Sequence, residues 1–445
     1  MNTNSVVPQP VQQITALAPA PIQSLPPASV KLENKSSKLN LMIGALFIMI
    51  LIIVGFIVYT LIQLNNRPAV LNNYEIAEKE KVVTLPDIVF GNFTKLNNAI
   101  LPPTNTTSTD GRLPNGLAGS GDSVDASHTT LLKIGLTYKM WYEGLTTDST
   151  PRIYYAESND MLTWRKKDNS LPQASDTTST NGRIPLGTEG KGDSKGASNP
   201  SVLFLENEYK MWYCGFNGSN RRVFHATSPD GLTWTKKDNS IPDQSNTTGT
   251  NGRIPNGLVG TFDERDSCAP ELMWDKEDQI YKMWYSSVDP GYIGYATSPD
   301  GLTWTKKDNS IPDKSNTTGT NGRIPNGLQG SADARYVRNA TVVKVNSKYH
   351  MWYVGRPIEQ MGQVLVYATS LDGLTWTKFN NDLSIYKNRS NGLGMNGSLL
   401  LGTEGTRDFE GFGAADALYE DGVLYLVYFG FNVNNGIETA VSVKL

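Results

Sequence analysis

The segment TWTKKDNSIPD occurs twice, at residues 233–243 and 303–313, and a close variant, TWRKKDNSLPQ, occupies residues 163–173. Self-similarity at a fixed period is the signature of repeat architectures. A second segment, YKMWY or YHMWY, recurs about every 70 residues, beginning at Tyr138, Tyr209, Tyr281 and Tyr349. Between these segments, alternating apolar and aromatic residues with tight Pro-Asp-Gly turns favour four short strands over helices. Repeated four-stranded units predict a β-propeller.

The ends of the chain give the number of blades. In the second unit we expect strands at 198–206, 209–216, 222–228 and 232–237, whereas the last unit stops after three strands. Residues from Phe93, FTKLNNAILPPTNTTSTDGRLPNGL, match the stretch that begins at Trp234 without a gap. The N-terminal strand should therefore complete the last blade and leave no open sheet edge. The sequence predicts an all-β, five-bladed propeller with circular closure over residues 81–445.

The tryptophans follow the repeat. Eight of the nine occupy two repeat positions, four in the second strands and four in the fourth strands: Trp141, Trp212, Trp284 and Trp352, then Trp164, Trp234, Trp304 and Trp376. An equivalent aromatic residue in every blade favours packing between blades over sugar-stacking platforms. The SPDGLTW turn resembles the Asp-box of sialidases, a hairpin device remote from the site, and predicts no catalytic role.

Composition excludes several classes of function. The net charge is −3, which argues against nucleic-acid binding. Three scattered histidines form no zinc-hydrolase motif, and no P-loop is present. Cys214 and Cys268 lack CxxC spacing, so we predict no metal site. Their positions favour two separate thiols, with a disulfide as the alternative outside the cytoplasm.

The N-terminal part predicts a membrane anchor. The 22 residues from Leu41 to Ile62 carry no charge, and a helix of that length spans about 33 Å, enough to cross a bilayer core; a buried globular helix is the alternative. Three lysines precede the span and one arginine follows it closely, which places the N-terminus in the cytoplasm and the propeller at the cell surface or in the periplasm. We expect a disordered Pro-rich tail at 1–38, a transmembrane helix at 39–64 and a stalk at 65–80.

One acidic position recurs in all five units, at the end of a long Asn-, Thr- and Gly-rich connection. We expect these five carboxylates to encircle the mouth of the central channel, where they would bind sugar hydroxyls or a cation: Asp122, Asp193, Asp263, Asp333 and Asp408. The alternative is that each carboxylate satisfies backbone N–H groups of its own loop.

Acids that break the repeat are better candidates for catalysis, because a catalytic site is asymmetric. They are Asp125, Glu264, Asp266, Glu271, Glu410 and Asp416, and the basic residues that differ by blade are Lys195, Arg265, Arg335 and Arg338. We predict Asp263, Glu264, Asp266 and Glu410 as catalytic. Substrate binding is predicted for four recurring aspartates and two arginines: Asp122, Asp193, Asp333, Asp408, Arg265 and Arg335. Ordinary surface charge is the alternative for each of them.

The phrases YKMWYSS and IGYATSPDGLTWTK, with a DxxxxxxP approach to the inner strand, resemble the five-bladed glycoside hydrolase superfamily. That group includes family 43 arabinanases and xylosidases, family 32 invertases and phosphorylase-like proteins. The resemblance covers residues 81–445 and implies an Asp base or nucleophile, a Glu acid and an auxiliary Asp from different blades. At the inner-strand positions where the resemblance places the Asp base or nucleophile, this chain has no acidic residue; the residues there are His128, Asn199, Ala269, Asn339 and Ala414. Cys268 stands where the resemblance places the Glu acid.

Two functions therefore stay open. One is a membrane-anchored glycoside hydrolase with an atypical set of acids, acting on a carbohydrate or glycoconjugate without a cofactor other than a channel cation. The other is a catalytically silent carbohydrate-binding or surface-recognition propeller. The two middle repeats differ over 25 residues only at Gln244 and Lys314, which favours recent duplication or several equivalent sites over one specialised pocket.

Overall fold

The computed structural model describes residues 93–359, 362–379, 381–390, 397–431 and 436–443. The chain divides into two compact units, Met1–Thr84 and Leu85–Leu445, and every described residue belongs to the second. The predicted tail, membrane span and stalk lie outside the described residues. Within the described ranges, no helix is long and apolar enough to cross a membrane.

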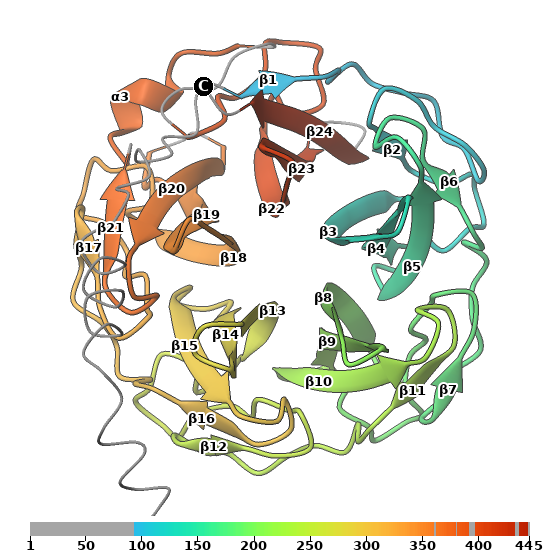
Figure 1. Cartoon of the computed structure of the whole chain (residues 1–445), viewed down its shortest axis with the longest axis horizontal. Coiled ribbons are helices and arrows are strands. Elements are labelled where there is room, and N and C mark those ends of the chain that lie inside the picture. The colour runs from blue at the N-terminus through green and yellow to red at the C-terminus, as the bar shows by residue number, and fades with distance from the viewer. Residues whose placement is uncertain (1–92, 360–361, 380, 391–396, 432–435, 444–445) are drawn as a thin grey trace, which may run out of the picture. The chain divides into compact units, whose positions relative to one another are not determined.

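Five antiparallel sheets surround a central axis, as Figure 1 shows, so the predicted five-bladed propeller is confirmed. The inner strands line the axis: β3 (Asp125–Ile134), β8 (Gly196–Leu205), β13 (Cys268–Asp275), β18 (Tyr336–Val345) and β22 (Gly411–Glu420). The second strands follow: β4 (Thr137–Leu145), β9 (Glu208–Phe216), β14 (Ile280–Ser286), β19 (Lys348–Arg356) and β23 (Val423–Phe431). The third strands are β5 (Pro151–Ser158), β10 (Arg221–Ser228), β15 (Ile293–Ser298), β20 (Val364–Ser370) and β24 (Gly436–Val443).

The fourth strands are short: β6 (Arg165–Lys166), β11 (Trp234–Lys236), β16 (Trp304–Lys306), β21 (Trp376–Phe379) and β1 (Thr94–Lys95). The strand bounds predicted for the second unit agree with the structure to within two residues. The expectation of four strands per blade is wrong for blades 2, 3 and 4, because the preceding connection pairs with the fourth strand as a fifth: β7 (Thr178–Ser179), β12 (Thr248–Gly249) and β17 (Thr318–Gly319). A further short strand, β2 (Leu113–Pro114), pairs with β24, and a single helical turn, α3, spans Leu383–Tyr386.

Circular closure is confirmed. Strand β1 pairs with β24, with Thr94 opposite Val441 and Lys95 opposite Ala440. Phe93 is fully buried and packs edge-on against Trp352, with ring centroids 6.0 Å apart. The N-terminal strand thus occupies the place of a fourth strand, and its phenylalanine takes the place of the repeat tryptophan.

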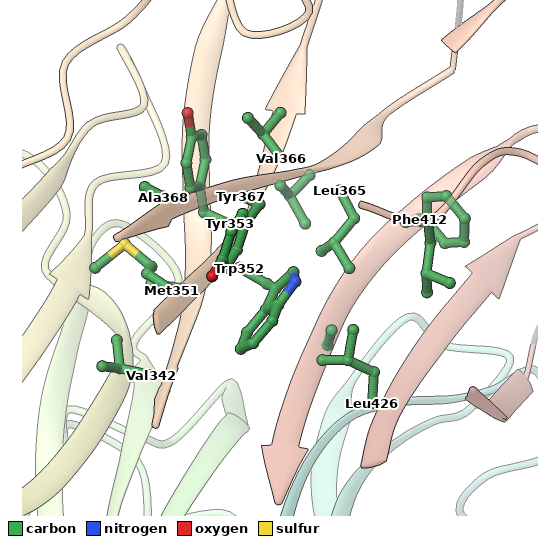
Figure 2. Close-up of a cluster of buried hydrophobic side chains, with 14 of the residues drawn as sticks. Val342, Met351, Trp352, Tyr353, Leu365, Val366, Tyr367, Ala368, Phe412 and Leu426 are labelled. Carbon is green, nitrogen blue, oxygen red and sulfur yellow. The ribbon is translucent and has the colours of Figure 1, made fainter. Parts of the chain in front are cut away.

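The eight repeat tryptophans are fully buried between blades, as predicted. A second-strand tryptophan meets the fourth-strand tryptophan of the next blade edge-on at 5.8 Å for Trp141 and Trp234, and the other two pairs repeat this contact. Figure 2 shows the corresponding boundary at blade 5, where Trp352 lies near Leu365 and faces Phe412 and Leu426. These aromatic contacts hold the blades together and offer no platform for a ligand.

Candidate functional site

The central channel narrows where each inner strand enters the sheet. There the channel wall contains a β-bulge in every blade. Four of the residues at this level are non-glycine residues with positive φ: His128, Asn199, Ala269 and Asn339. They line a cavity of about 30 Å³, room for about one water molecule. A sugar-sized ligand therefore cannot thread the channel at this level. The end at which the inner strands begin is here called the upstream mouth.

A continuous belt of hydrogen bonds ties the inner strands together just below the bulges. In each blade one side chain accepts the backbone N–H of the next inner strand around the ring, at 2.5 to 3.2 Å. The five acceptors are Thr130, Ser201, Glu271, Thr341 and Asp416. Because Asp416 in blade 5 accepts from Leu131 in blade 1, the belt closes on itself.

Two members of the belt, predicted only as repeat-breaking acids, form a coupled carboxyl pair. The Thr341 hydroxyl lies 3.2 Å from Glu271 Oε1 and 3.1 Å from Asp416 Oδ1, and it also accepts the Ala417 N–H. One hydroxyl proton cannot serve both carboxylates, so the second contact requires a proton on a carboxyl group. Burial raises the pKa of Asp416 to about 7 and, with the charge of Asp416, raises the pKa of Glu271.

A second acidic group lies at the upstream mouth, on blade 1. Glu143 of β4 is opposite Ser127 of β3, which places its side chain on the same face as Asp125. His128 Nδ1 lies 3.2 Å from Glu143 Oε2, and His128 Nε2 lies 3.4 Å from the Asn339 amide nitrogen. His128 Nδ1 also lies 3.1 Å from the Ser127 hydroxyl, so the imidazole sits between Ser127, Glu143 and Asn339.

The two blade 1 carboxyl groups differ in environment. Burial, reinforced by the nearby charge of Glu143, raises the pKa of Asp125 to about 7. One Asp125 oxygen is buried without a hydrogen-bond partner among the described residues. A carboxyl group that holds a proton near neutral pH beside a second carboxylate is suited to general acid–base chemistry. Sequence reasoning named Asp125 but missed Glu143, whose only sequence signal is an acid directly after YKMWY in the first unit alone.

Blades 2 and 3 carry a disulfide at the mouth. Cys214 of β9 and Cys268 of β13 are bonded, with their Cα atoms 4.9 Å apart, so the expectation of two separate thiols is wrong. The bond joins blades 2 and 3. Cys268 begins its inner strand at the position where the resemblance places a catalytic Glu, and this half of the mouth therefore has no acid at that position.

The five recurring aspartates do not encircle the channel mouth, which corrects the sequence prediction. All five are fully buried, and each is paired with the lysine of its blade's fourth strand at 2.5 to 2.8 Å: Asp122–Lys166, Asp193–Lys236, Asp263–Lys306, Asp333–Lys378 and Asp408–Lys95. A tyrosine hydroxyl from the second strand is a further donor to each: Tyr142, Tyr213, Tyr285, Tyr353 and Tyr428. We call each such group a hub.

The hub explains why the aspartate recurs. Its lysine also donates to two backbone carbonyls of the long connection, as Lys306 does to Ser245 at 2.8 Å and Pro255 at 2.7 Å. The hub therefore fastens the connection to its blade, and Asp263 is not accessible to substrate. A lysine follows each repeat aromatic by two residues and therefore recurs with the same period as the aspartate. This shared period was the feature of the sequence that could have predicted the ion pair.

The other predicted site residues do not form one cluster. Glu264 bonds within its own loop to the Gly260 N–H at 2.7 Å, and Asp266 accepts the Arg221 N–H at 2.9 Å. Arg265, Arg335, Lys195 and Glu410 are exposed. Across the described ranges, no group of three or more His, Cys, Asp or Glu residues is placed to hold a metal ion, so the expected channel cation has no such donor cluster.

Solved structures identify the architecture. A glycoside hydrolase superposes with a TM-score of 0.53 at 16% identity, covering 79% of this chain and 92% of that chain. A Bacteroides thetaiotaomicron structure described as a glycosidase gives a TM-score of 0.53 at 15% identity, covering 80% and 98%. The chain has the fold of the five-bladed glycoside hydrolases. A third structure with this glycoside hydrolase fold, described as an RGII complex, gives a TM-score of 0.52 at 17% identity over 78% and 91%.

Sequence comparison finds similarity over only part of the chain. Two uncharacterised Mycobacterium tuberculosis proteins, from strains CDC 1551 and H37Rv, are each 34% identical to this chain over 128 residues. The match covers 27% of this chain and 38% of each relative. No family model matches the sequence. The glycoside hydrolase fold is thus established by the three-dimensional comparison.

Proposed function

We propose that the propeller binds and hydrolyses carbohydrate at the upstream mouth of its channel, with Asp125 as the general acid and Glu143 as the second carboxylate. The observation that carries the proposal is the blade 1 carboxyl pair on a fold shared with glycoside hydrolases. Asp125 has a pKa of about 7, so it retains a proton at neutral pH for delivery to a leaving-group oxygen. Glu143 would activate a water or attack the sugar.

Three features support this location. The channel is closed below the mouth, so a bound sugar would rest against the bulge residues. The His128 imidazole packs beside Glu143, with Nδ1 3.2 Å from Oε2, and limits the positions open to that carboxylate. The positive φ angles at the bulges are strained for non-glycine residues, and such strain gathers at functional sites.

A specific observation favours a second function, a catalytically silent carbohydrate-binding propeller. The positions at which the resemblance places catalytic acids hold His128, Asn199, Ala269, Asn339 and Ala414, all of which line the channel cavity. In this case, the same mouth would bind sugar through its amides, and Asp125 and Glu143 would accept hydrogen bonds from sugar hydroxyls.

A panel of aryl-glycosides and a glycan array separate the two functions. For the enzyme, Asp125→Asn and Glu143→Gln should each lower turnover about 100- to 10,000-fold while glycan binding persists. Glu157→Gln is the matched control, because Glu157 lies on β5, a third strand that does not line the channel, and should leave turnover unchanged. Binding by the wild-type chain without any turnover would contradict the enzyme and support the silent module.

We further propose that a single-pass anchor at residues 41–62 holds the propeller outside the cytoplasm. The Cys214–Cys268 disulfide supports this location, because disulfides persist in oxidising compartments. Protease added outside intact cells should remove the propeller and leave a protected fragment of about 65 residues, the length up to the predicted outer end of the span. A protected propeller would contradict the proposed orientation.

A further inference from the structure

The wall of the upstream mouth formed by blade 4 is basic. Arg338 precedes the bulge of β18, and Arg356 lies opposite Tyr336 at the end of β19. Side chains at directly opposed and at alternate positions of paired strands share one face of the sheet. Arg338, Arg356 and Tyr336 therefore occupy one face at the mouth, and the Arg338 guanidinium stacks on the Tyr336 ring at 4.6 Å.

Arg338 is held in place by neutral groups. Its Nη2 donates to Gln363 Oε1 at 2.9 Å and to the Tyr336 hydroxyl at 3.3 Å. Its Nε is buried without a hydrogen-bond partner, and no ion pair joins Arg338 or Arg356 to a carboxylate in the part of the chain that the structure describes. A partly buried guanidinium costs free energy unless an anion or enough hydrogen bonds compensate for lost water.

A third arginine adds to the same positive field. Arg221 of blade 2 is half-buried and forms a long ion pair with Asp266, at 3.9 Å. Burial lowers the pKa of Arg338, and the charges of Arg356 and Arg221 lower it further. Asp125 and Glu143 lie on the wall formed by blade 1, and Asp266 lies beside Arg221, whereas Arg338 and Arg356 on blade 4 form no ion pair among the described residues.

We infer that Arg338, together with Arg356 and Arg221, binds an oxyanion of the ligand, so that the mouth selects a carbohydrate bearing a carboxylate or phosphate group. The planar guanidinium suits such groups because its N–H donors match two oxygens at once. This inference rests on the proposed function for its carbohydrate part, while the anion site stands on the arginines alone.

The test measures binding of three probes to the full-length chain at low salt: a uronic-acid oligosaccharide, its carboxyl-reduced neutral counterpart, and inorganic phosphate. The wild type should bind the charged oligosaccharide at least about tenfold more tightly than the neutral one. Arg338→Gln and Arg356→Gln should reduce that ratio toward one, and Arg338→Lys should retain part of it. Arg165→Gln, on the outer strand β6, removes the same charge away from the mouth and should keep the full ratio.

The outcomes separate the anion site from the carbohydrate function. Equal binding of charged and neutral oligosaccharides by the wild type would overturn the anion site and leave the carbohydrate proposal standing. Phosphate binding that is lost in Arg338→Gln, without binding of either oligosaccharide, would support the anion site and contradict the carbohydrate function. No binding of any probe would overturn both. A phosphate-dependent rise in Tm, present in the wild type and absent in Arg338→Gln, gives a readout independent of activity.

Discussion

The hub in blade 3 can be tested by replacing its lysine, Lys306→Met. Lys306 Nζ makes three hydrogen bonds, to Asp263 and to the carbonyls of Ser245 and Pro255, and neither charged side chain is exposed to solvent. Methionine fills a similar volume but leaves the Asp263 carboxylate without its counterion. Removing one partner of a buried pair costs about 3–5 kcal/mol. The Ser245 carbonyl loses its donor, while the Pro255 carbonyl keeps the Ser267 hydroxyl at 3.1 Å, and the lost hydrogen bonds place the expected loss in the upper half of that range.

Urea unfolding followed by tryptophan fluorescence measures this loss, because eight tryptophans are fully buried. The adjacent Lys307 is exposed, so Lys307→Met is a matched control expected to change the free energy of unfolding by less than about 0.5 kcal/mol. Adding Asp263→Asn to Lys306→Met removes the stranded charge, and the double variant should be less destabilised than the sum of the single variants. Additive losses, or a Lys306→Met chain as stable as the control, would refute the hub.

Two further predictions concern closure and pH. A chain that begins at residue 101 lacks β1 and opens the edge of β24 at Ala440 and Val441, while β2 still pairs at its start. This chain should aggregate or lose cooperative unfolding; light scattering that shows a monomer as stable as the chain from residue 81 would argue against closure. Asp125 and Asp416 have pKa values near 7 and Glu438 near 8, all raised by burial, so the folded chain binds more protons than the unfolded chain. The free energy of unfolding should therefore fall by about 3 kcal/mol from pH 6.5 to 8, and by about a quarter less in Asp125→Asn. Buried His225, whose pKa is lowered to about 3, opposes this trend below pH 6.5, and the comparison therefore starts at pH 6.5. A chain more stable at pH 8 than at pH 6.5 would contradict the raised pKa values of the three carboxyl groups.

The sequence alone determined the number of blades, the bounds of the four strands predicted for the second unit, and the ring closure. These features are local or periodic: the 70-residue repeat, the alternation within each strand, and the match of Phe93 to the repeat tryptophan are all visible along one chain. The interface role of the eight tryptophans followed from the same regularity. A pattern that recurs in every blade constrains packing strongly, because every blade boundary must satisfy the same contact.

The positions and contacts of the functional side chains were decided only by the tertiary structure. The repeat placed Asp263 just before an inner strand. The folded connection pairs through β12 with β16, the fourth strand of blade 3, and only this fold shows that the Asp263 carboxylate turns inward to Lys306. Glu271, Thr341 and Asp416 meet because three inner strands converge at one axis, and the disulfide forms because blades 2 and 3 bring Cys214 and Cys268 together. At the mouth, a one-residue bulge reverses which side of a strand a residue faces. Asp125, Glu143 and the arginines of the mouth could therefore be assigned to opposing walls only once register and bulge positions were fixed in three dimensions.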